Sequence, residues 1–258
     1  MRVPARTATS FLLLMLLTAL AYAEPLDKCQ EYLKYGIPSA EGDLLCRKGY
    51  ALAHNPDRKT PDWVAEHLTP ENASARMDRK NYFQPDPDLP PGRRAELADY
   101  KNSGYDRGNM APPGDMRWDL EAYKQSFYLS NVAPQVGRHM NRGIWAQLEE
   151  KVREWAKKRG ELYVYTGPIY DEQVDAFETI GENDVAIPSH FYKIIFDPKA
   201  KEAIAFMMPN DELRTEGLPH YIVSVDLVEA ETGLDFLSKF DAAEQSRIES
   251  KKAAGLWK

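Results

Sequence analysis

The most informative part of the sequence lies between residues 105 and 149. It opens with Tyr105-Asp106-Arg107-Gly108-Asn109-Met110-Ala111-Pro112 and closes with Asn141-Arg142-Gly143-Ile144-Trp145-Ala146-Gln147-Leu148-Glu149. Prolines and a glycine follow the opening run, and such residues interrupt regular secondary structure. We therefore expect a loop that carries Arg107 and Asn109, followed in the chain by a helix that carries Asn141 and Glu149.

The segment from Asn141 to Arg159 has the strongest helical pattern in the chain. Its apolar residues form one stripe, made of Ile144, Trp145, Leu148, Val152 and Trp155. On a continuous helix Asn141 and Glu149 would lie about 80° apart around the axis, with Trp145 between them. An amide oxygen and a carboxylate on one face can hold a hard cation, one as a direct ligand and the other through a metal-bound water.

The rest of the chain predicts an α+β fold. Strand patterns cover 50–53, 63–68, 162–166, 190–196, 203–208 and 221–224, and helix patterns cover 93–101, 119–126 and 226–232. The later strands follow one another with only turn signals between them, which favours a mainly antiparallel central sheet flanked by helices. The segments 69–80 and 82–92 are predicted as loops, the second because of its dense prolines.

The N-terminal residues have the composition of a secretory signal peptide. Arg2 and Arg6 precede an apolar run at 11–17, and small residues occupy the positions before a cut after Ala23. That run is shorter than the roughly 20 residues that span a bilayer. We therefore expect a mature protein from Glu24 onward without a membrane anchor, secreted or periplasmic.

Cys29 and Cys46 are the two cysteines of the sequence. Export would place them in an oxidising compartment, where we expect a disulfide between them. Closing this short loop would contribute about 3 kcal/mol. The alternative is two separate buried thiols.

The overall charge limits how the protein meets a polyanion. The 258 residues carry a formal net charge of −7, so long-range attraction to nucleic acid has the wrong sign. A nucleic-acid partner would have to be held by a compact basic patch or by a metal ion. Arg107 offers a planar donor fork that matches a phosphate, and catalysis at a phosphodiester is largely positioning and charge stabilisation.

Three runs together are similar, in order and spacing, to one known family. They are the runs at 105–112 and 141–149 quoted above and Leu129-Ser130-Asn131-Val132-Ala133-Pro134-Gln135. They resemble the DNA/RNA non-specific endonucleases, which are ββα-metal (His-Me finger) nucleases. Weaker likeness at 166–168, 187–193, 206–210 and 232–236 extends the resemblance over about residues 63–240.

The resemblance implies a fold, an activity and a domain organisation. It implies a ββα-metal nuclease fold and Mg²⁺-dependent hydrolysis of DNA and RNA, with Mn²⁺ as the alternative metal. The chain would then divide into a signal peptide (1–23), a disulfide-stapled N-terminal segment (24–62), the endonuclease domain (63–240) and a charged tail (241–258) that offers little to bury.

The resemblance also assigns roles to individual residues. Asn141 corresponds to the asparagine that ligates Mg²⁺, and Glu149 to the acid that holds a metal-bound water. Asn131 corresponds to the asparagine that orients the catalytic group or the scissile phosphate. Arg107 corresponds to the arginine that faces the phosphate. A second phosphate arginine is expected upstream, and both Arg79 and Arg76 are candidates.

One position departs from the family pattern. The family has a histidine as general base where this chain has Asn109, and an amide has no nitrogen that takes a proton near neutrality. Losing a general base typically lowers a rate by about 10²- to 10⁴-fold. Three readings stay open: Asn109 positions a water in a slower nuclease, another imidazole such as His139 replaces the base, or the protein binds nucleic acid without cutting it.

Overall fold

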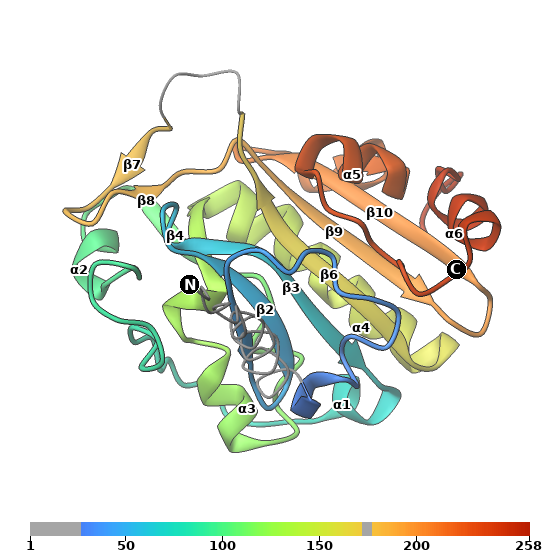
Figure 1. Cartoon of the computed structure of the whole chain (residues 1–258), viewed down its shortest axis with the longest axis horizontal. Helices are drawn as coiled ribbons and strands as arrows, with labels where there is room; N and C mark the ends of the chain where they lie inside the picture. Colours follow the sequence, from blue (N-terminus) through green and yellow to red (C-terminus); the bar gives the residue numbers. More distant parts are fainter. Residues whose placement is uncertain (1–26, 172–176) are drawn as a thin grey trace, which may run out of the picture.

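The computed structural model of the protein describes residues 27–171 and 177–258 (Figure 1). Its centre is a seven-stranded sheet in the order β1-β2-β3-β6-β9-β10-β11, and every neighbouring pair in it is antiparallel. The predicted α+β fold with a mainly antiparallel central sheet is confirmed. The predicted signal peptide lies outside the described residues.

The elements follow the chain in this order. The strands of the central sheet are β1 (Asp43–Cys46), β2 (Tyr50–Asn55), β3 (Thr60–Leu68), β6 (Leu162–Ile169), β9 (His190–Asp197), β10 (Glu202–Pro209) and β11 (Ile222–Val223). Two further strand pairs are β4 (Tyr105–Asn109) with β5 (Val132–Val136), and β7 (Thr179–Ile180) with β8 (Val185–Ala186). The α-helices are α1 (Pro70–Ser74), α2 (Leu97–Tyr100), α3 (Leu120–Gln125), α4 (Ala146–Arg159), α5 (Val225–Thr232) and α6 (Ala242–Glu249).

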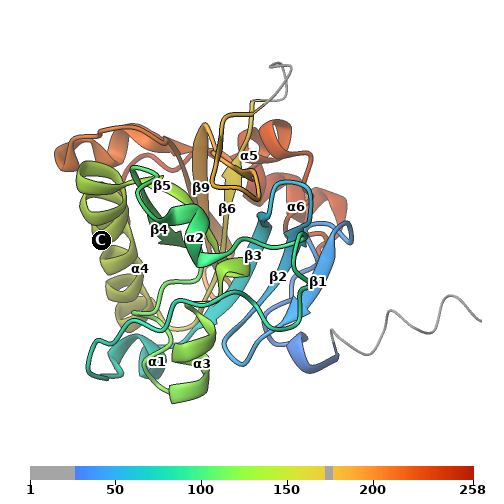
Figure 2. The same ribbon diagram turned by 90° about the vertical axis from the view of Figure 1, so that its left-hand side faces the viewer.

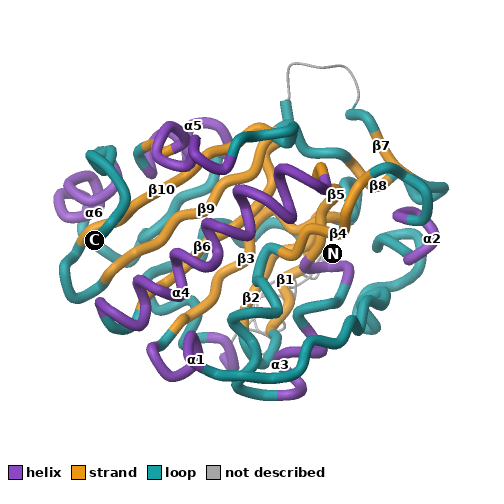
Figure 3. Tube along the Cα trace, turned by 180° about the vertical axis from the view of Figure 1, so that it is seen from behind, coloured by secondary structure: helices purple, strands orange, loops and turns teal. Residues whose placement is uncertain are grey.

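Helices cover both faces of the central sheet. Helix α4 runs across one face, and α5 and α6 lie on the other (Figures 1 and 3). Side chains alternate between the two faces of a strand. Along β9, Ile195 therefore packs in the core under α4, whereas Ile194 and Phe196 pack in the core under α5 and α6. Both faces are buried, which explains why the later strands are almost continuously apolar.

The stretch that was expected to be a loop forms a strand pair. Strands β4 and β5 are antiparallel, with Gly108 opposite Ala133 and Arg107 opposite Pro134, and they stand beside α4 (Figure 2). The loop prediction was wrong because glycine and proline were taken as breakers. A two-stranded ladder has a free edge on each strand, where a proline without an N–H is tolerated.

The predicted helix from Asn141 to Arg159 is interrupted near its start. A π-helical segment, Gly137–Trp145, precedes α4, and Gly143 within it has non-helical angles of φ −119° and ψ −110°. Asn141 therefore lies before a break, and the angular relation expected for one continuous helix with Glu149 does not hold. The order strand, strand, helix of the expected ββα unit is formed by β4, β5 and α4.

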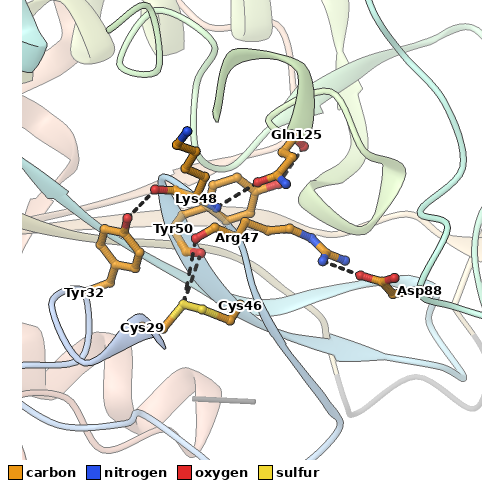
Figure 4. The surroundings of a disulfide bond; sticks show 8 residues. All are labelled: Cys29, Tyr32, Cys46, Arg47, Lys48, Tyr50, Asp88 and Gln125. Atoms are coloured by element: carbon orange, nitrogen blue, oxygen red, sulfur yellow. Dashed lines mark hydrogen bonds and ion pairs between the residues drawn. A yellow bond between two sulfur atoms is a disulfide. The ribbon is translucent and has the colours of Figure 1, made fainter. Parts of the chain in front are cut away.

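The N-terminal segment is tied to the central sheet. Cys29 and Cys46 form the predicted disulfide, with their Cα atoms 5.7 Å apart (Figure 4). Cys46 ends β1, which pairs with β2 in the same sheet as β3. The next residue, Arg47, forms ion pairs of 2.6 Å with both Asp86 and Asp88. The disulfide thus fastens the start of the chain to a strand that is itself anchored to the 82–92 loop.

The C-terminal segment is also packed, contrary to the expectation that it offers little to bury. Ile248 on α6 is buried in the core under α5 and α6. The Trp155 indole N–H on α4 donates to the Trp257 carbonyl at 3.0 Å, and the Arg159 guanidinium lies 4.3 Å from the Trp257 ring centroid. The end of the chain therefore covers part of α4. Within residues 27–171 and 177–258, every helix is too short or too polar to cross a bilayer.

Candidate active site

One cleft brings together most of the residues that the sequence singled out. It lies at the β4–β5 pair and the first turns of α4. Arg79, Arg107, Asn109, Asn141 and Glu149 line it, together with Asn81, Phe83, Asp106, Pro112, Pro113, Gly114, Arg117, Tyr123, Phe127, Arg142, Ala146 and Arg153. These residues come from four separate parts of the chain, and folding assembles them.

Two of the residues that were expected in the site do not line the cleft. Arg76 is exposed just after α1 and is absent from the lining of the cleft, so Arg79 is the upstream arginine that the structure brings to the site. Asn131 is fully buried beneath the cleft.

Asp106 fixes the orientation of the Asn141 side chain. Asn141 Nδ2 donates to Asp106 Oδ2 at 3.0 Å. Because the amide nitrogen is engaged there, the carbonyl oxygen of the same amide is the atom left for another partner. An amide oxygen is a hard ligand of the kind that Mg²⁺ and Ca²⁺ accept. Sequence spacing does not reveal this role, because Asp106 and Asn141 are far apart in the chain.

Glu149 is a half-buried acid one turn into α4. Burial raises its pKa to about 7, the positive charges of Lys193 and Arg153 oppose that rise, and the negative charge of Asp115 adds to it. A carboxyl group with this pKa exchanges its proton near neutrality, which is the property of a general acid or base.

A buried cluster of charges lies behind Glu149. Arg153 Nη1 donates to Asp115 Oδ1 at 2.7 Å, and Lys193 Nζ donates to Thr166 Oγ1 at 2.7 Å. Lys193 and Glu66 are both buried. Burial raises the pKa of Glu66 and lowers that of Lys193, while each charge favours the ionised form of the other.

Sequence reasoning missed this cluster because Lys193 interrupts an apolar strand pattern, and an isolated lysine in such a pattern is usually exposed. The alternation along 190–196 was the available signal, since it places Lys193 on the same face as Phe191 and Ile195.

Arg107 is held over an aromatic ring. Its guanidinium carbon lies 4.3 Å from the centroid of the Phe83 ring, and Phe83 packs edge-on against Phe127 with centroids 4.9 Å apart. Stacking of this kind orients a guanidinium without using its N–H donors. Among the described residues, no carboxylate lies within ion-pair distance of Arg107, Arg79 or Arg117. These cations are therefore free to meet an anion.

The amides of Asn109 and Asn131 share one backbone acceptor. Asn109 Nδ2 donates to the Ser126 carbonyl at 2.7 Å, and Asn131 Nδ2 donates to the same oxygen at 2.8 Å. Asn131 also bonds both the N–H and the carbonyl of Ala111, each at 2.9 Å. In this structure Asn131 fixes the backbone around Asn109, and Asn109 keeps its amide oxygen for the cleft.

His139 lies outside the lining of the cleft that Asn109 lines. It is exposed and lines a separate depression with Glu212, Leu213, Arg214, Thr215 and Glu216, and it is absent from the lining of the cleft. His139 and Asn109 therefore line different hollows in this structure, and the replacement of the family histidine by His139 stays a prediction.

The cleft has the opposite charge to the whole molecule. Of the charged residues that the structure describes, five arginines and two acids line it, namely Arg79, Arg107, Arg117, Arg142 and Arg153 with Asp106 and Glu149, although the chain has a net charge of −7. This is the compact basic patch that an acidic protein needs in order to hold a polyanion. Arg117 and Arg153 were not among the residues expected from the sequence.

The sequence is similar to those of known nucleases. The family model for DNA/RNA non-specific endonucleases matches residues 29–243. Nuclease C1 of Cunninghamella echinulata is 37% identical over 227 residues, which cover 83% of this chain and 90% of that protein. The mitochondrial nuclease of Saccharomyces cerevisiae is 37% identical over 237 residues, 84% of this chain and 72% of that protein.

Human mitochondrial endonuclease G is 35% identical over 220 residues, 80% of this chain and 73% of that protein. In the crystal structure of an EndoG/EndoGI complex, a chain with 34% identity matches with a TM-score of 0.80, covering 88% of this chain and 98% of that one. The chain therefore belongs to the DNA/RNA non-specific endonuclease family, a family of phosphodiester hydrolases.

Proposed function

We propose that the protein is an exported, Mg²⁺-dependent endonuclease that hydrolyses phosphodiester bonds in DNA and RNA without sequence preference. One observation carries the proposal: Asn141, Glu149, Arg107 and Arg79 meet in one basic cleft. Such a cleft supplies a metal ligand, a proton-exchanging acid and phosphate-binding arginines, which are the groups that phosphodiester hydrolysis uses.

The donor set of the cleft suits a hard divalent cation. The candidate ligand and the acid near it, Asn141 and Glu149, offer oxygen atoms as ligands, and none of the described residues that line the cleft is a histidine or a cysteine. Oxygen donors favour Mg²⁺, with Mn²⁺ as the alternative. We assign the Asn141 amide oxygen as the direct ligand and Glu149 as the residue that holds a metal-bound water. The bound ion would neutralise charge on the phosphate.

The other side chains position the substrate and move protons. Arg107 and Arg79 bind phosphate oxygens through their N–H donors. Glu149, with a pKa of about 7, donates a proton to the leaving oxygen. The Asn109 amide oxygen positions the attacking water but takes no proton from it, so that proton passes to solvent. The reaction proposed here is therefore slower than one with a histidine at this position.

Export is proposed from the N-terminal sequence and is supported by the disulfide between Cys29 and Cys46, because disulfides persist in oxidising compartments. Two of the relatives above are named as mitochondrial, which gives the competing location. N-terminal sequencing of the protein recovered from the periplasm or medium should start at Glu24. Recovery only inside the cell, with residues 1–23 retained, would contradict export.

A second function has a specific observation in its favour. The position of the family's general base is occupied by Asn109, whose amide nitrogen is committed to the Ser126 carbonyl. A protein with this site would bind nucleic acid through the basic cleft and leave it intact.

A cleavage assay separates the two functions. The purified mature protein is incubated with supercoiled plasmid and, separately, with a long single-stranded RNA, in Mg²⁺ and in EDTA, and binding is followed in parallel by gel shift. The proposed nuclease degrades both substrates in Mg²⁺ and neither in EDTA. Retention of both nucleic acids without cleavage in Mg²⁺ or Mn²⁺ would establish the binding protein instead.

A further inference from the structure

Arg142 occupies a distinctive place in the cleft. It directly follows Asn141 and precedes the break in the helix at Gly143. Its side chain is 67% exposed, and its Nε lies 2.8 Å from Asp106 Oδ2. It also lines the cleft. An exposed arginine usually has many conformations. The ion pair with Asp106 restricts the Nε edge of this guanidinium to one position.

The carboxylate that fastens Arg142 also orients Asn141. Asp106 Oδ2 accepts both Arg142 Nε and Asn141 Nδ2, the latter at 3.0 Å. The backbone beside them is close, because a Cβ on Gly137 would lie 2.6 Å from Arg142 Nη2 and 3.0 Å from both Asp106 oxygens. Gly137 thus makes room for the guanidinium and the carboxylate, which lie together against the start of the π-helical segment.

This arrangement leaves most donors of Arg142 available. A guanidinium has five N–H donors in a planar fork, and the contact with Asp106 uses the Nε edge. The opposite edge, between Nη1 and Nη2, can form two parallel hydrogen bonds to a phosphate while the Asp106 contact persists. A lysine has three donors on one compact ammonium group, so it cannot offer one planar edge to Asp106 and a second to a phosphate.

We propose that Arg142 is a substrate-binding residue that holds a backbone phosphate next to the scissile one, on the Asn141 side of the cleft. The inference rests on the proposed nuclease function and deepens it. Arg107 lies on β4 and is oriented by Phe83, whereas Arg142 is oriented by Asp106. The two arginines therefore bind the nucleic-acid strand independently, because a different side chain orients each of them.

The competing explanation is structural: Arg142 serves only to neutralise Asp106. Under that explanation, removal of the guanidinium would change the stability of the site and leave the affinity for nucleic acid in the absence of metal unaltered. The two explanations differ in the salt dependence of binding, because a phosphate contact releases a counterion and an internal ion pair does not.

The test measures binding of a fluorescein-labelled thymidine oligonucleotide to the mature chain by anisotropy, in EDTA so that no cleavage occurs. Arg142→Gln should raise Kd by roughly fivefold or more at about 0.1 M salt and lower the slope of log K against log salt by about 0.7, the value for one single-strand phosphate contact. Arg142→Lys should show a smaller rise in Kd and retain most of the slope.

Arg138→Gln is the matched control. Arg138 is exposed in the same π-helical segment but does not line the cleft, so its removal should leave the slope unchanged. Melting temperatures of all variants exclude misfolding. If Arg142→Gln binds with the wild-type Kd and slope, or if Arg138→Gln weakens binding equally, the assignment of Arg142 is wrong. If the wild type itself shows no salt-dependent binding, the proposed function fails and the inference falls with it.

Discussion

Asn141 Nδ2 donates to Asp106 Oδ2 at 3.0 Å, so a carboxylate on β4 determines which end of the Asn141 amide faces the cleft. The two residues are far apart in sequence and meet because β4 pairs with β5 and the chain then turns into the π-helical segment. The proposed metal ligand is thus oriented by a residue of the β4–β5 strand pair, although it belongs to the segment before α4.

Removal of Asp106 should raise the Mg²⁺ concentration that the reaction requires. Asp106→Ala frees the Asn141 amide to rotate, and loss of such an orienting partner typically costs about 10- to 100-fold in metal affinity or activity. The measurement is the Mg²⁺ concentration that gives half-maximal cleavage of a labelled oligonucleotide. Asp211→Ala, at an exposed acid outside the cleft, is the control. An unchanged Mg²⁺ requirement in Asp106→Ala would refute the orienting role.

A histidine at position 109 should accelerate the reaction. A ring N–H of the new side chain can donate to the Ser126 carbonyl as Asn109 does, which leaves the second nitrogen to take a proton from water. We expect Asn109→His to increase kcat/KM by about 10²-fold or more. Its pH–rate profile should gain a break at about 6.5, where the wild type has none from this position. Equal rates and identical profiles would show that the base position is not limiting.

Replacement of Glu149 should stabilise the fold while it removes activity. Burial raises the folded-state pKa of Glu149 from 4.5 to about 7, so the fold favours the protonated form. The stability that comes from protonation is present below about pH 4.5 and is lost as the pH rises through 7. In EDTA, Glu149→Gln should therefore melt at the wild-type temperature near pH 4.5 and above it at pH 8, by about 2–4 °C for each kcal/mol.

Glu150→Gln, at the exposed neighbouring position, should show no such growing difference. A Glu149→Gln variant that gains nothing between pH 4.5 and pH 8 would mean that folding does not raise the pKa of Glu149.

The buried charges behind the cleft should contribute to the free energy of unfolding in a non-additive way. Lys193→Met removes the larger of the two positive charges that act on Glu66, and the loss of the opposite charge near a buried ionised group costs up to about 3–5 kcal/mol. Glu66→Gln in the same chain should recover a large part of that loss, so that the double variant is more stable than the sum of the single variants predicts. Urea unfolding of the four proteins measures the coupling, and strict additivity would contradict it.

Strands and helices could be predicted where the spacing of apolar residues in the sequence follows their burial in the fold. The patterns at 190–196 and 203–208 correspond to β9 and β10, and Asp119 caps α3 through bonds to the Glu121 and Ala122 N–H groups, as the helix pattern at 119–126 predicted. The local patterns missed the pairing of β4 with β5, because long-range contacts decide this pairing and override the local tendencies of Gly108 and Pro134.

The site was predictable as a set of residues but not as an arrangement. Sequence similarity indicated Arg107, Asn141 and Glu149, and the structure places all three in one cleft. The break at Gly143 and the bond from Asn141 to Asp106 depend on tertiary contacts that no spacing rule contains. Arg153 was missed for a different reason, since a charged residue in an amphipathic helix is usually taken as part of its solvated face.

The most direct test of the account is the single-turnover rate of cleavage by Asn141→Ala in Mg²⁺, compared with wild type and with Asn72→Ala. Asn72 lies on α1 and does not line the cleft. The account predicts that Asn141→Ala loses at least about 10²-fold in rate while it still binds the oligonucleotide in EDTA, and that Asn72→Ala matches the wild type. Cleavage by Asn141→Ala at the wild-type rate would contradict the assignment of this cleft as the metal-dependent active site.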